Sequence, residues 1–169
     1  MRKRWTALLC ALALSVSLMV PAAQGAQSTQ GEVLQVLAAS VYKDMATSSS
    51  YVSPFSDVKY THWAAGYIKT GVDAGWINGY LDGTFRPDNG VKLEEAVNIC
   101  LKMLGYTDED FTTGTFPYPQ LALYQNLHMS TGITASQGEN LTREECAQLI
   151  YNTLNATTKS GQVYAATLG

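Results

Sequence analysis

The residues that could carry acid, base or nucleophilic chemistry are few, and they do not form a known catalytic pattern. The two histidines are His62 and His128, and the sequence has no nucleophile elbow, H-E-x-x-H motif or P-loop. Adjacent glutamates occur at 94–95 and at 144–145. Neighbouring residues of a helix point about 100 degrees apart, so neither pair is placed to flank one glycosidic bond. We therefore expect no enzymatic activity.

Two acidic turns prompt calcium binding as an alternative. They are Asp82-Gly83 and Asp88-Asn89-Gly90. An EF-hand loop that began at Asp82 would need acidic residues at its third and fifth positions, where the sequence has Thr84 and Arg86. These residues do not suit the calcium cage, so we expect no metal and no cofactor.

Cys100 and Cys146 each lie within an apolar pattern of helical spacing. No C-x-x-C pair and no metal-ligand spacing accompanies them. We interpret both as buried free thiols. A disulfide between them is the alternative, because two cysteines in an exported chain can pair.

The elements that would position these residues are helices that share one local start signal. A threonine followed three residues later by a glutamate forms a capping box, in which the hydroxyl and the carboxylate each accept from an exposed amide. The three starts are Thr29–Glu32, Lys92–Glu95 and Thr142–Glu145. Lys92 stands in place of a threonine, so the second cap lacks its hydroxyl. Apolar residues at helical spacing also predict helices over 118–129 and 143–154.

The first 25 residues have the layout of a secretory signal peptide. Basic residues at 2–4 precede an apolar run at 5–20, and a small-residue stretch ends near Gly25. The run is too short for a stable membrane span, which needs about 20 residues, and no later segment is apolar enough for one. We expect an exported chain whose mature form has no transmembrane segment.

The charge of the mature chain is acidic. Removing the predicted signal peptide leaves eight Lys and Arg residues against 14 Asp and Glu residues, a formal net charge of −6. This balance argues against nucleic acid as a partner, because phosphates need a basic face. An anionic ligand would have to be held by a local cationic cluster.

Residues 55–106 carry a specific series of short motifs. F-S-D-V begins at Phe55, H-W-A at His62, and the turn G-Y-L-D-G-T-F-R-P-D at Gly79, followed by a helix that contains L-E-E-A. This series resembles the S-layer homology repeat, in which F-x-D-V, H-W-A, G-Y-x-D-G-T-F-R-P-D and T-R-A-E recur in the same order. The resemblance implies an all-α fold, with helix-turn-helix repeats in a pseudo-threefold spindle around one core. It also implies non-covalent anchoring to the cell wall at a bacterial surface.

The resemblance divides the chain into repeats, the first of them incomplete. The predicted segments are a signal peptide at 1–25, a partial repeat (second helix only) at 28–46, a linker at 47–54, a full repeat at 55–106, a diverged repeat at 115–156 and a tail at 157–169. The end of the tail, GQVYAATLG, alternates in a strand-like way.

The ligand implied by the resemblance is a cell-wall polysaccharide that is anionic, often through a pyruvate ketal on its terminal sugar. The family's arginine falls on Arg143, where binding and plain solvent exposure are both open, while Gln30 and Leu93 occupy the equivalent positions. An arginine suits a carboxylate because its planar guanidinium donates two parallel hydrogen bonds. The candidate glycan-binding residues are Arg143, Thr142, Glu145, Gln30, Trp76, Tyr80 and Asp82.

Several aromatic and charged residues have a structural interpretation beside the functional one. Trp63 is expected in the core, with groove contact as the alternative, and Trp76 fits either place. Tyr80 and Asp82 belong to a glycine turn, which Asp82 would cap. We expect Arg86 to pair with a carboxylate such as Asp88, and Asp57 to cap the turn before the helix that follows it.

The main alternative function is a structural or protein-interaction module that kept the fold but lost glycan binding. It would follow from the absence of arginine at two of the three equivalent positions. An incomplete first repeat would also leave apolar surface uncovered, so the chain could associate with a second copy of itself.

Overall fold

The computed structural model describes residues 27–41 and 53–168, and over these residues the fold is all-α, as predicted. The elements are α2 (Gln30–Val41), α3 (Ala65–Asp73), α4 (Leu93–Met103), the 3-10 helix η1 (Asp108–Phe111), α5 (Tyr118–Asn126), α6 (Arg143–Asn155) and α7 (Tyr164–Thr167). β-pairing in the described part is limited to isolated bridges. The predicted signal peptide, and the linker as far as residue 52, lie outside the described residues.

The capping box that the sequence predicts begins α6. The Glu145 amide donates to Thr142 Oγ1 at 3.2 Å, and the Thr142 amide donates to Glu145 Oε2 at 3.1 Å. Lys92 has no acceptor in its side chain, so α4 keeps only the carboxylate half, with the Lys92 amide donating to Glu95 Oε2 at 3.0 Å. Local hydrogen bonding therefore fixes where these helices begin.

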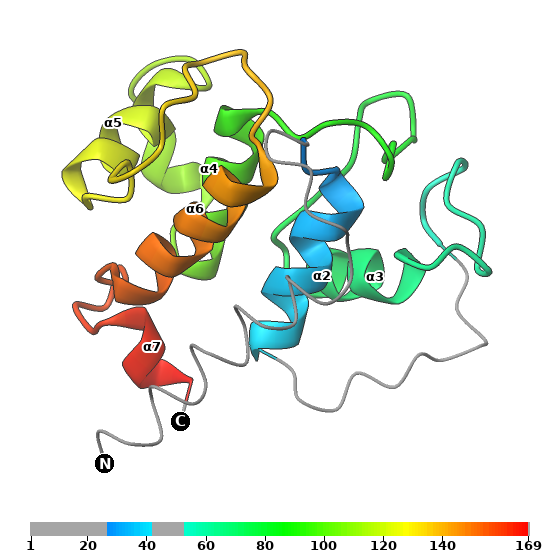
Figure 1. Cartoon of the computed structure of the whole chain (residues 1–169), viewed down its shortest axis with the longest axis horizontal. Helices are drawn as coiled ribbons and strands as arrows, with labels where there is room; N and C mark the ends of the chain where they lie inside the picture. Colours follow the sequence, from blue (N-terminus) through cyan, green and yellow to red (C-terminus); the bar gives the residue numbers. More distant parts are fainter. Residues whose placement is uncertain (1–26, 42–52, 169) are drawn as a thin grey trace.

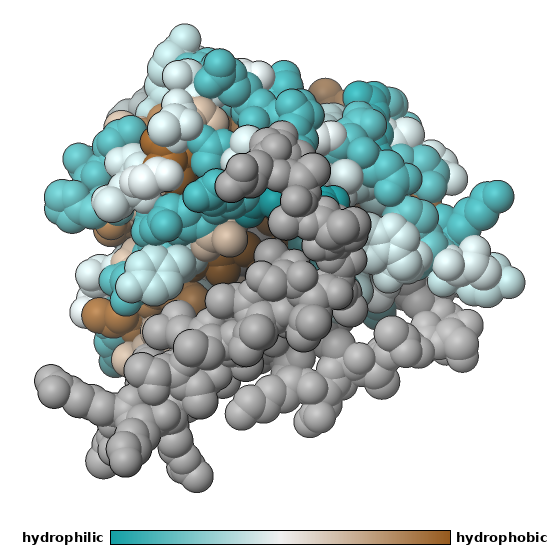
Figure 2. All heavy atoms as spheres, in the orientation of Figure 1, coloured by the Kyte–Doolittle hydropathy of each residue, from teal (hydrophilic) through white to brown (hydrophobic). Residues whose placement is uncertain are grey.

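One hydrophobic cluster connects all the α-helices of the described chain. Its members include Leu34 of α2, Ile68 of α3, Leu101 of α4, Tyr124 of α5 and Leu149 of α6, and Tyr164 of α7 closes the end of the cluster. The predicted single core is confirmed by this cluster. On the face shown in Figure 2 most residues are hydrophilic, as expected for a surface that covers such a core.

The helices pack in an order that the hairpin pattern did not predict. The principal packed pairs are α2 with α3, α4 with α5, α6 with α7, and α4 with α6. Figure 1 shows α2 beside α3, and α7 at the end of α6. The helices on either side of each turn, α3 and α4 or α5 and α6, are not among these pairs. The first helix of each predicted repeat therefore packs on the second helix of the preceding one.

A closed ring of three backbone hydrogen bonds joins the segments that lead into α2, α4 and α6. The Ser28 amide donates to the Leu141 carbonyl at 3.0 Å, Leu141 to Val91 at 2.9 Å, and Val91 back to Ser28 at 3.0 Å. All three residues are buried, and each immediately precedes a capping position. The three helix starts therefore hold equivalent positions in this ring. The complete spindle and the repeat boundaries remain predictions.

The glycine turn between α3 and α4 is held by a residue far from it in sequence. Asp57 accepts from the backbone amides of Phe85 at 2.9 Å and Arg86 at 2.7 Å. We had expected it to cap the turn beside it in the sequence, and this expectation was wrong. Gly79 has a φ of 71°, and a β-carbon there would lie 2.2 Å from Phe55 Cε1. Only glycine fits this position without moving the Phe55 ring.

The C-terminal tail corrects a prediction. The strand-like alternation in GQVYAATLG gives only one bridge, Thr157 with Val163, and the chain then turns into α7. The Tyr164 amide donates to the Ala156 carbonyl at 2.9 Å, and the Tyr164 side chain is buried. Burial of one aromatic ring against α6 decided the conformation, because so short an alternation carries little preference of its own.

Candidate functional site

The capping glutamates of α2, α4 and α6 divide their two oxygens between two tasks. In each, Oε2 accepts the backbone amide of the capping residue, from Thr29, Lys92 and Thr142 respectively. Oε1 faces the other way and accepts from a different group in each case: Arg143 for Glu32, Tyr80 for Glu95, and Thr134 with Ala135 for Glu145. The three helix starts thus present three chemically different sites.

At the first site, α6 and α2 meet through an ion pair, which we call the Arg143 site (Arg143, Glu32 and Thr29). Arg143 Nη2 donates to Glu32 Oε1 at 2.7 Å, and the two side chains are 32% and 27% exposed. Arg143 is therefore neither a free solvent-exposed cation nor fully enclosed. Its Nε is buried and has no hydrogen-bond partner in the described chain.

The second site, the Gln30 site, joins α2 to the glycine turn. Gln30 Nε2 donates to Tyr80 Oη at 2.7 Å, and Tyr80 Oη donates to Glu95 Oε1 at 3.2 Å. Burial is the main cause that raises the pKa of the Tyr80 hydroxyl above 10.0, so the group stays protonated and can keep donating. Gln30 is a buried residue, and its side-chain amide group is engaged in this chain of hydrogen bonds.

Arg86 borders the Gln30 site, and its partner differs from the one we predicted. Its guanidinium lies 4.3 Å from the centre of the Tyr80 ring, and Nη2 donates to Asp82 Oδ2 at 2.7 Å instead of to Asp88. Asp82 also accepts from the Thr84 hydroxyl and amide, as the turn cap we predicted. The Thr84 hydrogen bonds first, and then Arg86, lower the pKa of Asp82 to about 2.

The third site lies at Glu145 of α6, and the arginine-equivalent position of α4 is occupied there by Leu93. Leu93 is 4% exposed and belongs to the core. Burial alone would raise the pKa of Glu145, but hydrogen bonds from Thr142 and Thr134 outweigh it and lower that pKa to about 2. Glu145 Oε2 accepts from Thr142 at the α6 start, and Oε1 accepts from Thr134 and Ala135 in the preceding loop, so Thr142 and Glu145 act there as a structural cap.

Trp63 lies outside the core where we expected it, whereas Trp76 takes one of the two places that the sequence left open. Trp76 is 7% exposed and lies in the core, which leaves its ring no free face for a ligand. Trp63, predicted for the core, is 48% exposed. A β-carbon at Gly31 would lie 3.2 Å from Trp63 Cζ2, so the ring lies against the first turn of α2.

Three successive residues in the first turn of α2 therefore face three different neighbours. Gln30 contacts the glycine turn, Gly31 lies under Trp63, and Glu32 reaches Arg143. The sequence analysis named Gln30 and Arg143 as candidates, gave groove contact for Trp63 only as the alternative, and did not name Glu32 among the candidates. The capping pattern marked Glu32 as structural, and nothing in it showed that the second oxygen would face another helix.

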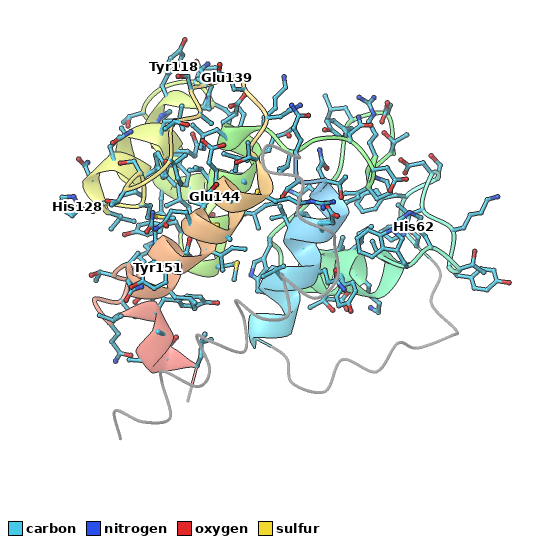
Figure 3. The ribbon with its side chains drawn as sticks, in the orientation of Figure 1. His62, Tyr118, His128, Glu139, Glu144 and Tyr151 are labelled. Atoms are coloured by element: carbon cyan, nitrogen blue, oxygen red, sulfur yellow. The ribbon has the colours of Figure 1, made fainter. Side chains whose placement is uncertain are left out.

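No catalytic or metal-binding cluster is found within the described ranges. His62 and His128 lie on opposite sides of the molecule in Figure 3, and no group of three His, Cys, Asp or Glu residues in this part of the chain could hold a metal ion. Among the same residues, no helix has both the length and the apolar character that a membrane crossing requires.

Comparison with known proteins places the motifs in a family. Residues 54–97 match the family model of the S-layer homology domain. The chain is 36% identical over 76 residues to cell surface glycoprotein 1 of Acetivibrio thermocellus. It is 30% identical over 110 residues to a cell surface protein of Thermoanaerobacter kivui, and 40% identical over 50 residues to a cellulosome-anchoring protein of A. thermocellus.

These alignments cover 45%, 64% and 30% of this chain but only 3%, 14% and 11% of the respective relatives. The chain thus corresponds to a small part of each of them. The family match and the relatives support a location at the cell surface. From its motifs, its helical fold and this match, we conclude that the chain carries an S-layer homology domain at residues 54–97.

Proposed function

We propose that this chain anchors non-covalently to a cell-wall polysaccharide, with the head of α2 and the Arg143 guanidinium as the binding surface. The family match and the surface-protein relatives support cell-surface anchoring. The observation that carries the finer proposal is the half-exposed Arg143, which is fixed by one hydrogen bond to Glu32 and keeps other N–H donors.

The chemistry of these donors suits an acidic sugar. A guanidinium has five N–H groups, and carboxylates accept two parallel bonds from it. A pyruvate ketal would supply the carboxylate. The half-exposed Trp63 ring, which lies against the first turn of α2, could cover the apolar face of a sugar ring.

Co-sedimentation with purified bacterial walls tests the proposal. Arg143→Gln removes the cation, and we expect it to weaken wall binding about ten- to a hundredfold, because a charge-assisted hydrogen bond is lost. Arg143→Lys keeps the charge without the planar fork and should restore part of the binding.

The matched control is Lys159→Gln, which removes a cation that is also ion-paired, with Asp110, but lies in the loop before α7. It should bind walls as the unmodified chain does. Equal binding by Arg143→Gln and the unmodified chain, with both folded by circular dichroism, would reject the assignment of Arg143.

A protein-interaction module is the second candidate, and one observation favours it. Both arginines of the described chain are already paired with carboxylates, Arg86 with Asp82 and Arg143 with Glu32. Sedimentation that survives removal of the wall polysaccharide would support protein interaction, whereas its loss would support glycan anchoring.

A further inference from the structure

The Arg143 guanidinium already has a carboxylate on it, supplied by the chain itself. Glu32 lies 111 positions away in the sequence, yet its Oε1 accepts from Arg143 Nη2 at 2.7 Å. This is the contact that the carboxylate of an acidic sugar would seek. An internal group therefore occupies one of the donors on which such a ligand depends.

Glu32 cannot easily swing away from the arginine. Its other oxygen, Oε2, accepts from the Thr29 amide at 3.0 Å and from the Thr29 hydroxyl at 3.3 Å. The Glu32 amide in turn donates to the Thr29 hydroxyl at 3.3 Å. Releasing the carboxylate would open the cap of α2 and leave the Thr29 amide without this acceptor.

The ion pair also changes the charge that a ligand meets. Arg143 and Glu32 together carry no net charge, and Glu32 presents a like charge to any incoming carboxylate. The hydrogen bond to Glu32 uses Nη2 of the guanidinium, so other N–H donors remain while the net attraction for an anion is reduced. Arg86, the other arginine of the described residues, is likewise paired with a carboxylate, that of Asp82.

We propose that Glu32 sets the affinity of this chain for acidic sugars, as an internal carboxylate that competes with the ligand's carboxylate for Arg143. The natural ligand in this inference rests on the proposed function, but the competition at Arg143 does not. Removing the Glu32 charge should strengthen binding of carboxylate ligands and leave neutral ligands unaffected.

Glu32→Gln tests this without removing the cap. Glutamine at the third helix position also completes a capping box, because its amide oxygen accepts from the Thr29 amide. Asp110→Asn is the matched control, since Asp110 also caps a helix start and pairs with a cation, Lys159, away from the proposed binding surface. Glu144→Gln is a second control, because it removes an exposed charge next to Arg143 in sequence.

Two measurements decide the proposal. In the first, wall binding is titrated on intact walls and on walls from which mild acid has removed the pyruvate ketal. Glu32→Gln should lower the half-saturating concentration on intact walls about threefold or more, with the controls unchanged and no gain on ketal-free walls. Unchanged or weaker binding of Glu32→Gln to intact walls would overturn the proposal and would indicate that Glu32 positions Arg143.

In the second measurement, sodium pyruvate is titrated into ¹⁵N-labelled protein while the Arg143 Nε–H signal is followed by NMR. The signal is assigned by its loss in Arg143→Lys. Saturation at a lower pyruvate concentration in Glu32→Gln than in the unmodified chain supports the proposal, and equal midpoints overturn it. If no variant binds walls, the proposed function fails, while this titration still decides the role of Glu32.

Discussion

Cys100 and Cys146 are both buried in the core, and their surroundings suppress ionisation. Burial raises the pKa of Cys100 to about 11, although a hydrogen bond with Thr153 opposes this, and it raises the pKa of Cys146 to about 12. Both cysteines are free thiols, which confirms the interpretation made from their apolar surroundings in the sequence. Their protonated forms are thus favoured by folding.

At the residue scale we predict that neither thiol reacts with iodoacetamide in the folded chain at pH 8, because the thiolate is the nucleophile. Both should react once urea unfolds the chain, as measured by mass spectrometry. Rapid labelling under native conditions would contradict the burial of these groups.

Since the folded pKa values are raised above 9.0, the stability linked to the thiols is complete below pH 9 and is lost as the pH rises toward 11 and 12.

The hydrogen-bond partners of charged side chains could be predicted from the sequence only where the partner is close in sequence. The sequence predicted that Asp82 caps its own turn, and the structure confirms it, because both partners lie within two residues. Arg86 pairs with a nearby carboxylate, as predicted, but this is Asp82 and not the suggested Asp88, and the expected role of Asp57 was wrong. Asp57 bonds to amides 28 and 29 positions away, and a distance of that length is set by the fold and not by local sequence.

The starts of α4 and α6 have the same backbone geometry but differ in their capping hydrogen bonds. Lys92 and Thr142 have nearly the same extended conformation, with ψ angles of 154° and 163°. Thr142 accepts an amide hydrogen bond, whereas the Lys92 side chain has no acceptor. The start of α4 is therefore the weaker of these two element boundaries.

At the element scale we predict opposite effects of two substitutions. Thr142→Ala should lower the free energy of unfolding by about 1 kcal/mol, and Lys92→Thr should raise it by about 0.5 to 1 kcal/mol. Lys92→Ala is the control and should change little, since no cap is removed. Urea denaturation checks these values, and a loss of stability in Lys92→Thr would show that the α4 start does not accept a hydroxyl cap.

The whole molecule is held together by contacts between the predicted repeats more than within them. The ring through Ser28, Val91 and Leu141 joins three distant segments at one point. Each of α3, α5 and α7 packs on the α-helix that comes directly before it in the sequence. Because α7 covers α6 in the way that α3 covers α2, the short tail helix belongs to the core assembly.

At this scale we predict that Tyr164→Ala destabilises the entire chain. Removing a buried ring should cost about 3 kcal/mol and shift the single unfolding transition to lower urea. Val163→Ala, a neighbouring exposed residue, is the control and should leave the midpoint nearly unchanged. If Tyr164→Ala left the midpoint in place, α7 would be an appendage outside the cooperative core.

The sequence by itself determined the all-α class, the starts of α4 and α6, the cap at Asp82 and the family motifs over 54–97. These features depend on hydrogen bonds between residues two to four positions apart and on the spacing of apolar residues, which are both local. Single-sequence reasoning therefore reached them.

Only the tertiary structure decided what the candidate site contains. It brought Glu32 onto Arg143, buried Trp76, exposed Trp63 and placed α3 against α2. Each of these depends on which segments meet across long stretches of chain. The charge and the accessible face of a binding site depend on such meetings, because a neighbouring carboxylate or a packed helix can neutralise or cover a side chain whose own chemistry is unchanged.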